Sequence, residues 1–431
     1  MFKKLGFAFV LMILTACNQI LPSTTHQTTT PQGFGFRYNP FDVSDYEEND
    51  EYYSSSAFKV AMLLPLSGKA STYGKGMQNA AMMALEDTNN KNLEVRFYDT
   101  KSSQEGAQNA LSTALAGKAQ LVLGPLMADE VSAISYQARN KNVPIISFST
   151  APHVLGNGVY TLGLLANEQI KRILGYASSQ NRRSVAVVVP DSPAGLNMAK
   201  SAVYAAADSG MTVTKIGFYE PTTLEFSNLV QQMSASKDFD TVLIAETGSR
   251  LKAIAGTFGY YDVAYPETLF VGTSVWENTN LNKETTLYKG IYPVISRVHN
   301  DYFEKKYKDL FGETPNTLYS YAYDSIALAS ALSRQGGRNL YASIENPDGY
   351  IGINGSFRLF EDGTNEHNLD IVEVNSSGLK TVSSSPKSFG AKPYFNQSTI
   401  TSRPQIYGKD QETVYEKLFQ SIQTPSYFNI F

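Results

Sequence analysis

The chain has 431 residues, of which 42% are hydrophobic, and a formal net charge of -4 from 36 basic and 40 acidic side chains. This length is sufficient for two domains or one large two-lobed body, and the hydrophobic content is ordinary for a folded globular protein. No long basic block is present, which argues against a nucleic-acid partner. The single cysteine, Cys17, leaves no second thiol for a disulfide and no thiolate cluster for a metal.

The first residues have the pattern of a secretory signal peptide. Lys3 and Lys4 supply the positive charge, and Leu5–Ile13 supplies an apolar run that is shorter than the roughly 20 residues needed to cross a bilayer. The following Leu14–Cys17 resembles the bacterial lipobox, whose cysteine is acylated before cleavage. We therefore expect residues 1–16 to be removed and Cys17 to carry the lipid; a plain secretory peptide with a chance cysteine is the alternative.

Acyl chains on Cys17 would hold the mature protein on a membrane, on the periplasmic side of a Gram-negative envelope. In the enterobacterial sorting rule, an aspartate after the cysteine favours retention in the inner membrane. The residue here is Asn18. This favours the outer membrane over the inner one.

Residues 17–57 are expected to form the lipidated N-terminus and a flexible tether. Ile20–Gln32 is rich in Thr, Pro, Ser and Gln, a composition that cannot bury enough apolar surface to fold. Phe34–Tyr53 mixes aromatic and acidic residues. This second stretch is interpreted either as disordered or as a short segment that docks on a partner.

From Phe58 onward, strand and helix patterns alternate. The expected strands are Lys59–Leu64, Leu93–Tyr98, Gln120–Leu123 and Val143–Ser147. One helix is expected over Met77–Thr88, after Ser71 and Thr72 as candidate caps, and two more at Gln104–Lys118 and Ala128–Lys141. Continuous apolar strands joined by helices indicate a parallel sheet covered on both faces.

The alternation then restarts. Strands are expected at Ser184–Val189, Met211–Tyr219, Thr241–Ala245 and Thr268–Gly272, with helices at Glu168–Ser179, Ala194–Ser209, Phe226–Ala235 and Arg250–Tyr260. Two consecutive doubly wound sheets imply two lobes of similar size.

Two more helices are expected at Tyr302–Phe311 and Tyr319–Arg334. Gly355–Leu359 and Leu369–Val374 are expected to pair as antiparallel strands around a turn at Asp362-Gly363. We assign residues 58–162 and 296–345 to the first lobe, 163–295 and 346–382 to the second, and 383–431 to a C-terminal extension. The extension is expected to be mostly irregular, with one weak helix near Glu412–Ile422, and its aromatic residues either pack on the lobes or dock a partner.

Several short motifs follow one another in a recognisable order. They are Pro65-Leu66-Ser67-Gly68, Leu123-Gly124-Pro125-Leu126, Val143–Thr150, Gly272-Thr273-Ser274 and Ala322-Tyr323-Asp324-Ser325. The ordered set resembles type I periplasmic binding proteins of the leucine-binding kind over about Phe58–Val374. This resemblance implies an α/β fold of two doubly wound parallel-sheet lobes with a hinge and a ligand cleft.

Within that superfamily, one subgroup is more similar. Leu123–Leu126 with Glu130-Val131, together with Ser147–Thr150 and Gly156–Tyr160, resembles the penicillin-binding protein activators. Those proteins are lipoproteins that stimulate a peptidoglycan synthase from the membrane. The resemblance implies a non-enzymatic regulator whose partners are the membrane, through the lipid anchor, and a peptidoglycan synthase.

Ligands of open α/β sheets bind beyond the carboxyl ends of the strands. Amino-acid binders of the resembled family hold the ligand carboxylate with hydroxyls and amides of the first lobe, hold its ammonium with an acid of the second lobe, and close over it with an aromatic ring. On this pattern, the candidate ligand-binding residues are Ser67, Tyr73, Ser149, Thr150, Asp191, Glu246, Ser274 and Trp276.

These candidates also have structural interpretations. Ser149 and Thr150 are suited to cap the next helix, and Tyr73 and Trp276 are suited to packing. Asp324, inside a helix, is interpreted as structural. The loop Met127–Asp129 lacks the serine run that meets the carboxylate in the resembled family, so an amino-acid zwitterion would lose part of its usual partners.

No local signature of an enzyme is present. The four histidines (His26, His153, His299 and His367) are scattered without metal-ligand spacing, and no nucleophile elbow or phosphate-binding glycine loop occurs. We therefore expect no enzymatic activity, no metal and no cofactor.

The alternative to a synthase regulator is a lipid-anchored substrate-binding protein that delivers amino acids or related solutes to an ABC permease. Either function leaves room for a small-molecule ligand in the cleft, including one that gates partner binding by lobe closure.

Overall fold

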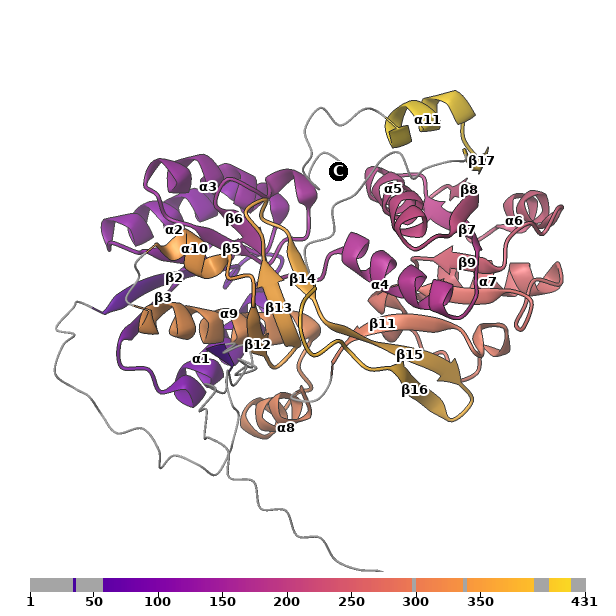
Figure 1. Ribbon diagram of the computed structural model, residues 1–431. Coiled ribbons are helices and arrows are strands. Elements are labelled where there is room, and N and C mark those ends of the chain that lie inside the picture. Colours follow the sequence, from indigo (N-terminus) through magenta and orange to yellow (C-terminus); the bar gives the residue numbers. More distant parts are fainter. Residues whose placement is uncertain (1–33, 36–56, 297–299, 336–338, 391–402, 420–431) are drawn as a thin grey trace, which may run out of the picture. The chain divides into compact units, whose positions relative to one another are not determined.

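A computed structural model of the protein describes residues 34–35, 57–296, 300–335, 339–390 and 403–419 (Figure 1). The predicted signal peptide and the predicted lipidation site at Cys17 lie outside the described residues, as does the tether apart from Phe34-Gly35 and Ala57. The described chain forms two mainly parallel sheets and one smaller antiparallel sheet, which are taken in turn.

The first sheet has five parallel strands in the order β3-β2-β4-β5-β6. The strands are β2 (Phe58–Leu64), β3 (Leu93–Asp99), β4 (Leu121–Leu123), β5 (Ile145–Ser147) and β6 (Val159–Thr161). Its helices are α1 (Ser71–Thr88), α2 (Gln104–Ala116), α3 (Ala128–Asn140), α8 (Asn300–Phe311), α9 (Thr317–Arg334) and α10 (Leu340–Ile344), with a short 3-10 turn, η1 (Pro152–Val154).

Strand β2 is buried on both faces, because its side chains alternate between two hydrophobic clusters. Val60, Met62 and Leu64 pack with residues of α1 and α9. Ala61 and Leu63 point the other way and pack with residues of α2 and α3. The expected parallel sheet covered on both faces is confirmed.

The second sheet has eight strands in the order β16-β15-β11-β10-β9-β7-β8-β17. Its parallel centre consists of β7 (Ser184–Pro190), β8 (Thr212–Tyr219), β9 (Thr241–Ile244), β10 (Leu269–Gly272) and β11 (Ile291–Ile295). Its helices are α4 (Ala166–Ser179), α5 (Pro193–Asp208), α6 (Ser227–Ser234) and α7 (Gly248–Tyr260), with 3-10 turns η2 (Ser274–Asn278) and η3 (Thr285–Leu287).

The same alternation as in β2 occurs in β7 of the second sheet. Val185, Val187 and Val189 pack with residues of α4 and α5. Ala186 and Val188 pack with residues of α6 and α7. Both lobes are therefore doubly wound α/β units, as the sequence indicated.

The strand pairing expected around Asp362-Gly363 is only partly right. The turn is there, but β13 (Gly355–Leu359) pairs with β14 (Asn365–His367) and not with Leu369–Val374. The strand that begins at Leu369, β15 (Leu369–Asn375), joins the second sheet, where it pairs antiparallel with β11 and with β16 (Gly378–Ser383).

The small antiparallel sheet belongs to the first core. It consists of β12 (Tyr350–Gly352), β13 and β14, with the backbone of β1 (Phe34–Gly35) beside β12. Tyr350, Phe357 and Leu359 lie in the same hydrophobic cluster as β2 and α9. Residues 346–382 were expected in the second lobe. The apolar face of this hairpin packs on the first core instead, whereas β15 and β16 are strands of the second sheet.

The C-terminal extension contains more regular structure than expected. Strand β17 (Gln405–Tyr407) pairs in parallel with β8, and helix α11 (Gln411–Phe419) buries Val414 and Leu418 in the second core. Strand β17 and helix α11 of the extension therefore pack on the second lobe.

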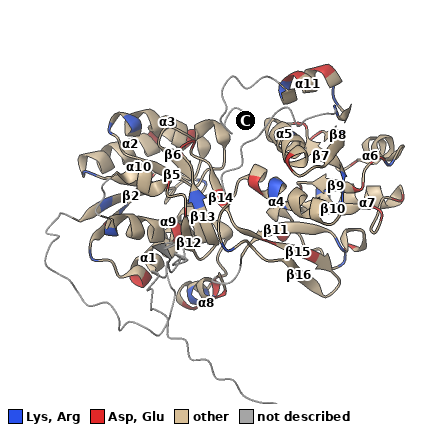
Figure 2. Ribbon diagram, viewed as in Figure 1, with Lys and Arg blue, Asp and Glu red and all other residues tan. Residues whose placement is uncertain are grey.

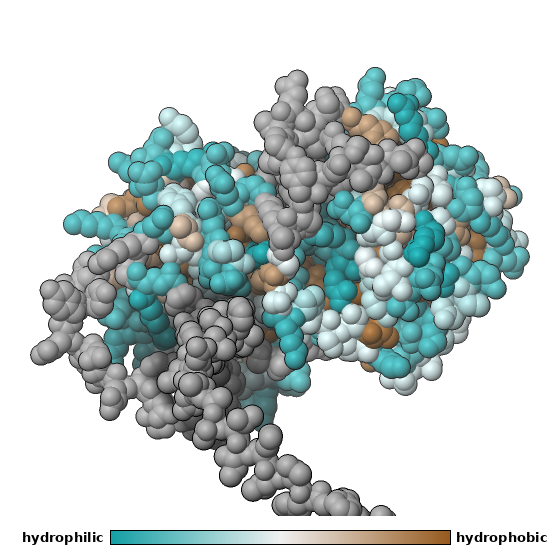
Figure 3. Space-filling model, viewed as in Figure 1, coloured by the Kyte–Doolittle hydropathy of each residue, from teal (hydrophilic) through white to brown (hydrophobic). Residues whose placement is uncertain are grey.

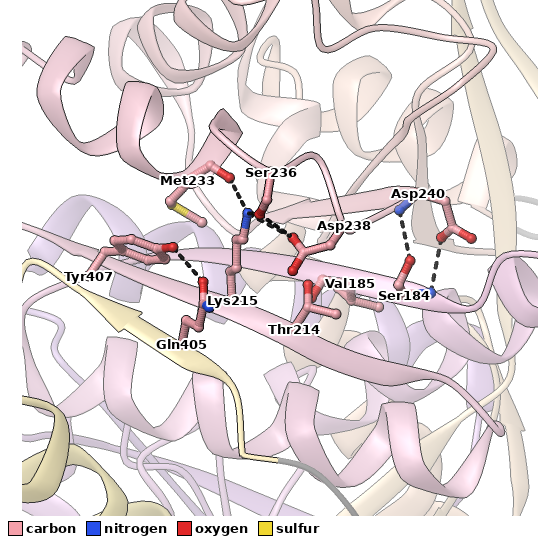
Figure 4. Close-up of polar contacts among 10 residues, drawn as sticks. All are labelled: Ser184, Val185, Thr214, Lys215, Met233, Ser236, Asp238, Asp240, Gln405 and Tyr407. Atoms are coloured by element: carbon pink, nitrogen blue, oxygen red, sulfur yellow. Dashed lines mark hydrogen bonds and ion pairs between the residues drawn. The ribbon is translucent and has the colours of Figure 1, made fainter.

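Strand β8 contains a buried charge beside β17. The Lys215 side chain is fully buried, and its Nζ donates to the Met233 carbonyl and to Ser236 Oγ at 2.6 Å each. The same Nζ lies 2.7 Å from Asp238 Oδ1 (Figure 4). A buried ammonium is tolerated when its hydrogen bonds are made in this way.

Charges of both signs are spread over the ribbons of Figure 2. Figure 3 shows hydrophilic residues over most of the face viewed, with hydrophobic residues in separate small groups. None of the described helices has the length and apolar character needed to span a membrane.

Candidate functional site

The candidate residues of the first lobe lie at the carboxyl ends of β2 and β5. Ser67 follows β2 and is exposed, and its hydroxyl donates to Asp99 Oδ2 at 2.6 Å while its amide donates to Asp99 Oδ1 at 3.1 Å. Asp99 ends β3 and also accepts from the Lys101 amide. Partial burial raises the pKa of Asp99, but these hydrogen bonds outweigh it and hold that pKa below its usual range. Ser67 is therefore engaged by an acid that the sequence analysis did not single out.

Ser149 stabilises its own loop. It is buried, its amide donates to Ser147 Oγ at 2.9 Å, and its Oγ accepts from the Ala151 amide at 3.3 Å. Ser147 Oγ in turn donates to the Pro125 carbonyl, which joins the ends of β4 and β5. Thr150 is exposed beside this loop. It is thus the Thr150 side chain, rather than that of Ser149, which faces solvent here.

The loop after β4 is organised by a buried acid. Glu130 is fully buried; it accepts from Thr100 Oγ1 at 2.9 Å and from the Met127 amide at 3.4 Å, at the start of α3. Burial raises the pKa of Glu130. Asp129 accepts from the Glu130 amide. The motif that resembled the activator subgroup therefore contains a structural carboxyl at this position.

Tyr73 lies in the first turn of α1 and is 46% exposed. An aromatic ring with half of its surface in water is not part of the core. A role of Tyr73 in ligand contact stays a prediction.

In the second lobe, Asp191 follows β7 and forms an ion pair with Lys409, which comes from the C-terminal extension. The Asp191 amide donates to the Tyr219 carbonyl at 2.7 Å, which fixes the acid beside the end of β8. Lys409 Nζ also lies 5.3 Å from the centroid of the Phe218 ring. A single residue of the extension thus supplies the counter-charge of a candidate binding residue.

Glu246, after β9, is also paired. Its Oε2 accepts from Tyr219 Oη at 2.5 Å and from Arg250 Nε at 2.9 Å, and its Oε1 accepts from the Thr247 amide. Burial raises the pKa of Glu246, but the hydrogen bonds from Tyr219 and Arg250 outweigh it and hold the pKa below its usual range. The carboxylate is thus kept ionised by groups of its own lobe.

The two candidates after β10 have different surroundings. The Ser274 amide donates to Gln169 Oε1 at 2.7 Å, which links η2 to α4. Trp276 is fully buried, its Nε1 donates to the Ile244 carbonyl at 2.8 Å, and its ring packs 5.6 Å from that of Tyr292. The expectation of Trp276 as a ligand contact differs from the structure, since the ring belongs to the second core.

A polar pocket lies near the start of α8 and α9. Its lining includes Glu277, Asn300, Glu304, Asn316 and Asn354, and none of the candidate residues. In the part of the chain that the structure describes, no group of three or more His, Cys, Asp or Glu side chains is arranged to hold a metal.

Comparisons with known proteins agree with this geometry. The family model described as periplasmic binding protein matches residues 57–379. An uncharacterized protein of Rickettsia prowazekii (strain Madrid E) is 20% identical over 342 residues, covering 75% of this chain and 88% of the relative.

Three solved structures show the same fold. The periplasmic ligand-binding protein of a branched-chain amino acid ABC transporter from Burkholderia xenovorans LB400 superposes with a TM-score of 0.61 at 13% identity, covering 76% of this chain and 95% of that one. A solute-binding protein from Rhodopseudomonas palustris BisB5 in complex with 3,4-dihydroxybenzoic acid gives 0.56 at 17% identity, with 78% and 98% covered. LivJ from Streptococcus pneumoniae in complex with isoleucine gives 0.54 at 19% identity, with 77% and 100% covered.

These identities show the fold alone, and the family model adds the family. Membership indicates a position outside the cytoplasm. Because the family model matches residues 57–379, from just before β2 to within β16, the chain belongs to the periplasmic binding protein family and has the leucine-binding-protein-like type I fold.

Proposed function

We propose that this protein is a non-enzymatic lipoprotein on the periplasmic side of a Gram-negative envelope, where it regulates a peptidoglycan synthase through protein contact. Three features support the proposal. They are the signal and lipobox pattern of residues 1–17, the activator-like motifs around Leu123–Val131 and Ser147–Thr150, and the hydrogen bonds and ion pairs that already engage polar groups at the strand ends. The lipid on Cys17 anchors the protein, and Asn18 favours the outer membrane.

The observation that carries the proposal is that three of the polar groups suited to an amino-acid ligand are already engaged by other groups of this chain. Ser67 is held by Asp99, and Asp191 and Glu246 are each paired with a cation. A zwitterion would have to displace these partners. At the largely buried Glu246 carboxylate, a hydrogen bond left unmade costs about 1–3 kcal/mol. The partly exposed ion pair at Asp191 contributes less energy, but it still neutralises the acid.

A reconstituted synthase reaction tests this proposal. The mature chain without its lipid would be added to each purified bifunctional peptidoglycan synthase of the same bacterium, and glycan polymerisation and cross-linking would be followed. The proposal predicts a saturable increase in rate and a complex that survives size exclusion. A transport-type binding protein of the same family serves as the control. Absence of both binding and stimulation with every synthase of the host would contradict the proposal.

A substrate-binding protein of an ABC transporter is the second candidate function. It is favoured by the ligands of the relatives, since isoleucine and 3,4-dihydroxybenzoic acid are bound by two proteins of the same fold. Thr150 and Tyr73, both exposed, are the residues of this chain best placed for such a ligand. Permease and ATPase genes beside this gene, together with micromolar binding of a small solute, would favour transport over regulation.

A further inference from the structure

The chain passes between the two cores at three crossings. The first runs from the end of β6 at Thr161 to the start of α4 at Ala166, and the second from Ile295 to Asn300. The third is short, since only Asn368 separates β14 from β15. Any motion of one lobe against the other has to be accommodated by backbone rotation in these segments.

The first crossing is hydrogen-bonded to the hairpin that leads into the third. Asn365, on β14, is fully buried, and its Nδ2 donates to the Thr161 carbonyl at 2.8 Å and to the Gly163 carbonyl at 2.7 Å. One side-chain amide therefore uses both of its hydrogens on a single crossing segment.

Backbone contacts reinforce this link at the hairpin turn. The Thr161 amide donates to the Gly363 carbonyl at 3.1 Å. Gly363 has a φ of +81°, and a Cβ atom there would lie 2.1 Å from the Val159 carbonyl oxygen. Only glycine lets the turn approach β6 this closely. The turn and Asn365 together attach the first crossing to the hairpin that leads into the third.

Within the first crossing, the bend is also fixed locally. The Gly163 amide donates to Thr161 Oγ1 at 3.0 Å, and the Leu162 amide donates to the Ser147 carbonyl at 3.0 Å. The carbonyls of Thr161 and Gly163 are then left to point toward Asn365. Without its amide, these buried acceptors would lose the donor that Asn365 supplies, which is costly in a low-dielectric interior.

We propose that Asn365 is a positioning residue of the hinge: by bonding the first crossing to the hairpin of the third, it makes two of the three linkers move as one body. Relative motion of the lobes is then left to the parts of the crossings that Asn365 does not bond: residues 164–165 of the first crossing, the second crossing, and the residues between Asn365 and β15. This inference concerns the hinge itself and holds whether a solute or a protein partner is the physiological ligand.

A distance measurement between the lobes tests the role of Asn365. Spin labels would be placed at Asn109→Cys on α2 and at Gln231→Cys on α6, both exposed positions, in a mature chain carrying Cys17→Ser. Because Cys17 is the only native cysteine, labelling is confined to the two chosen sites. Double electron–electron resonance then reports the interlobe distance distribution. A substitution that affects only the structure within one lobe would leave this distribution unchanged.

Asn365→Ala is expected to broaden this distribution relative to the native residue, and to make the amides of residues 162–164 exchange hydrogen roughly tenfold faster. The matched control is Asn90→Ala. Asn90 Nδ2 also bridges two segments, donating to Ser330 and Ser333, but both lie inside the first lobe. That variant is expected to lose stability without changing the interlobe distribution.

Two outcomes would overturn the proposal. One is an unchanged distribution in Asn365→Ala with an intact circular dichroism spectrum, which would make Asn365 an ordinary buried amide. The other is equal broadening in Asn90→Ala, which would show that any loss of first-lobe stability loosens the hinge. If Asn365→Ala does not fold, Asn365→Ser, which keeps a single shorter donor, is measured in its place, with the same two criteria.

Discussion

Asp324 is a buried carboxyl that connects a helix of the first lobe to the β12–β13 turn. Its Oδ1 accepts from the Ile353 amide at 2.8 Å, and its Oδ2 accepts from the Asn354 amide at 3.2 Å and from Asn354 Nδ2 at 2.8 Å. Burial raises the pKa of Asp324 to about 7, although these hydrogen bonds oppose the shift. The contacts agree with the interpretation of Asp324 as a structural residue.

His367 is the buried titratable group on β14. It is 6% exposed and stacks on Phe357 at 5.7 Å between ring centroids. Burial lowers the pKa of His367 to about 4. Asp324 and His367 therefore depart from their ordinary pKa values in opposite directions, and both departures favour the neutral form.

The two residues should have opposing effects on stability below neutral pH. As pH falls from about 7 to 3.8, folded Asp324 takes up a proton before the unfolded chain does, so its contribution to stability rises. As pH falls from 6.5 to about 4, the unfolded chain protonates its histidine before folded His367 does, so that contribution falls. We predict that Asp324→Asn makes the chain lose stability more steeply on acidification, whereas His367→Phe makes it lose less.

Urea unfolding of the native chain and both variants at several pH values between 4 and 7 measures these slopes. Both substitutions are expected to lower stability at neutral pH, so the slope rather than the midpoint is diagnostic. The double variant should show neither contribution. Parallel curves for all four proteins would contradict the prediction.

Trp276 provides a second test at the residue scale. Because the ring is fully buried and its Nε1 is hydrogen-bonded, Trp276→Ala should destabilise the second lobe by about 3–5 kcal/mol in chemical unfolding. The exposed Tyr73→Ala is the control, with an expected change within about 0.5 kcal/mol. As the only tryptophan, Trp276 should also give blue-shifted fluorescence in the native protein. Emission typical of an exposed indole would contradict its place in the core.

Among the elements, β17 and α11 are positioned by one glycine. Gly408 has a φ of +77°, and a Cβ atom there would lie 2.0 Å from the Phe218 carbonyl oxygen. The next residue, Lys409, reaches Asp191 from this turn. Gly408→Ala is therefore predicted to loosen the extension, with faster hydrogen exchange across residues 403–419 and a lower melting temperature.

Gly210→Ala is the matched control for this substitution. Gly210 has a similar φ of +69°, but a Cβ atom there would meet nothing within 4 Å. It should show only the strain of the left-handed backbone, about 1 kcal/mol. If the two substitutions have equal effects on the extension, the close approach of Gly408 to β8 is not what holds it.

The parallel strands β6 and β11 are absent from the strands expected from the sequence. Strands β2, β4, β5, β7, β9 and β10 were predictable because each is a mainly apolar run between helices of regular spacing. The small strands were not. Tyr350, Phe357 and Leu359 have a pattern that fits either lobe, and only the packing of the hairpin on α9 decides between them. A period of two residues identifies a strand but does not identify its partner.

The candidate site shows the same limit. Its loops were found from the ends of the predicted strands, because ligands of such sheets gather there. The partners of those side chains were not found. Asp99 lies at the end of a neighbouring strand, and Lys409 comes from a segment far along the chain, so no local pattern joins either to Ser67 or Asp191. The sequence around Trp276 contains no pattern that distinguishes an aromatic ring packed in the core from one that closes over a ligand.

At the scale of the whole molecule, the proposed anchoring depends on one group, the thiol of Cys17. We predict that Cys17→Ala abolishes incorporation of a labelled fatty acid and releases the protein from the membrane fraction, while the melting temperature of the body is unchanged. Labelling of growing cells followed by fractionation measures both effects. Ser102→Ala, a substitution in the body, should leave the label in place. A membrane-bound, unlabelled native protein would contradict lipidation at Cys17.

The central claim is that Ser67, Asp191 and Glu246 are already engaged by other groups of the chain, so that the protein acts by contact with a partner rather than by capturing a free amino acid. Titration calorimetry of the mature chain with each amino acid, supported by thermal unfolding in their presence, tests this most directly. The account predicts no heat of binding and no stabilisation. A ligand that binds at micromolar concentration, and that stabilises the fold by about 2.7 kcal/mol at one hundred times its Kd, would contradict the account and favour the transport function.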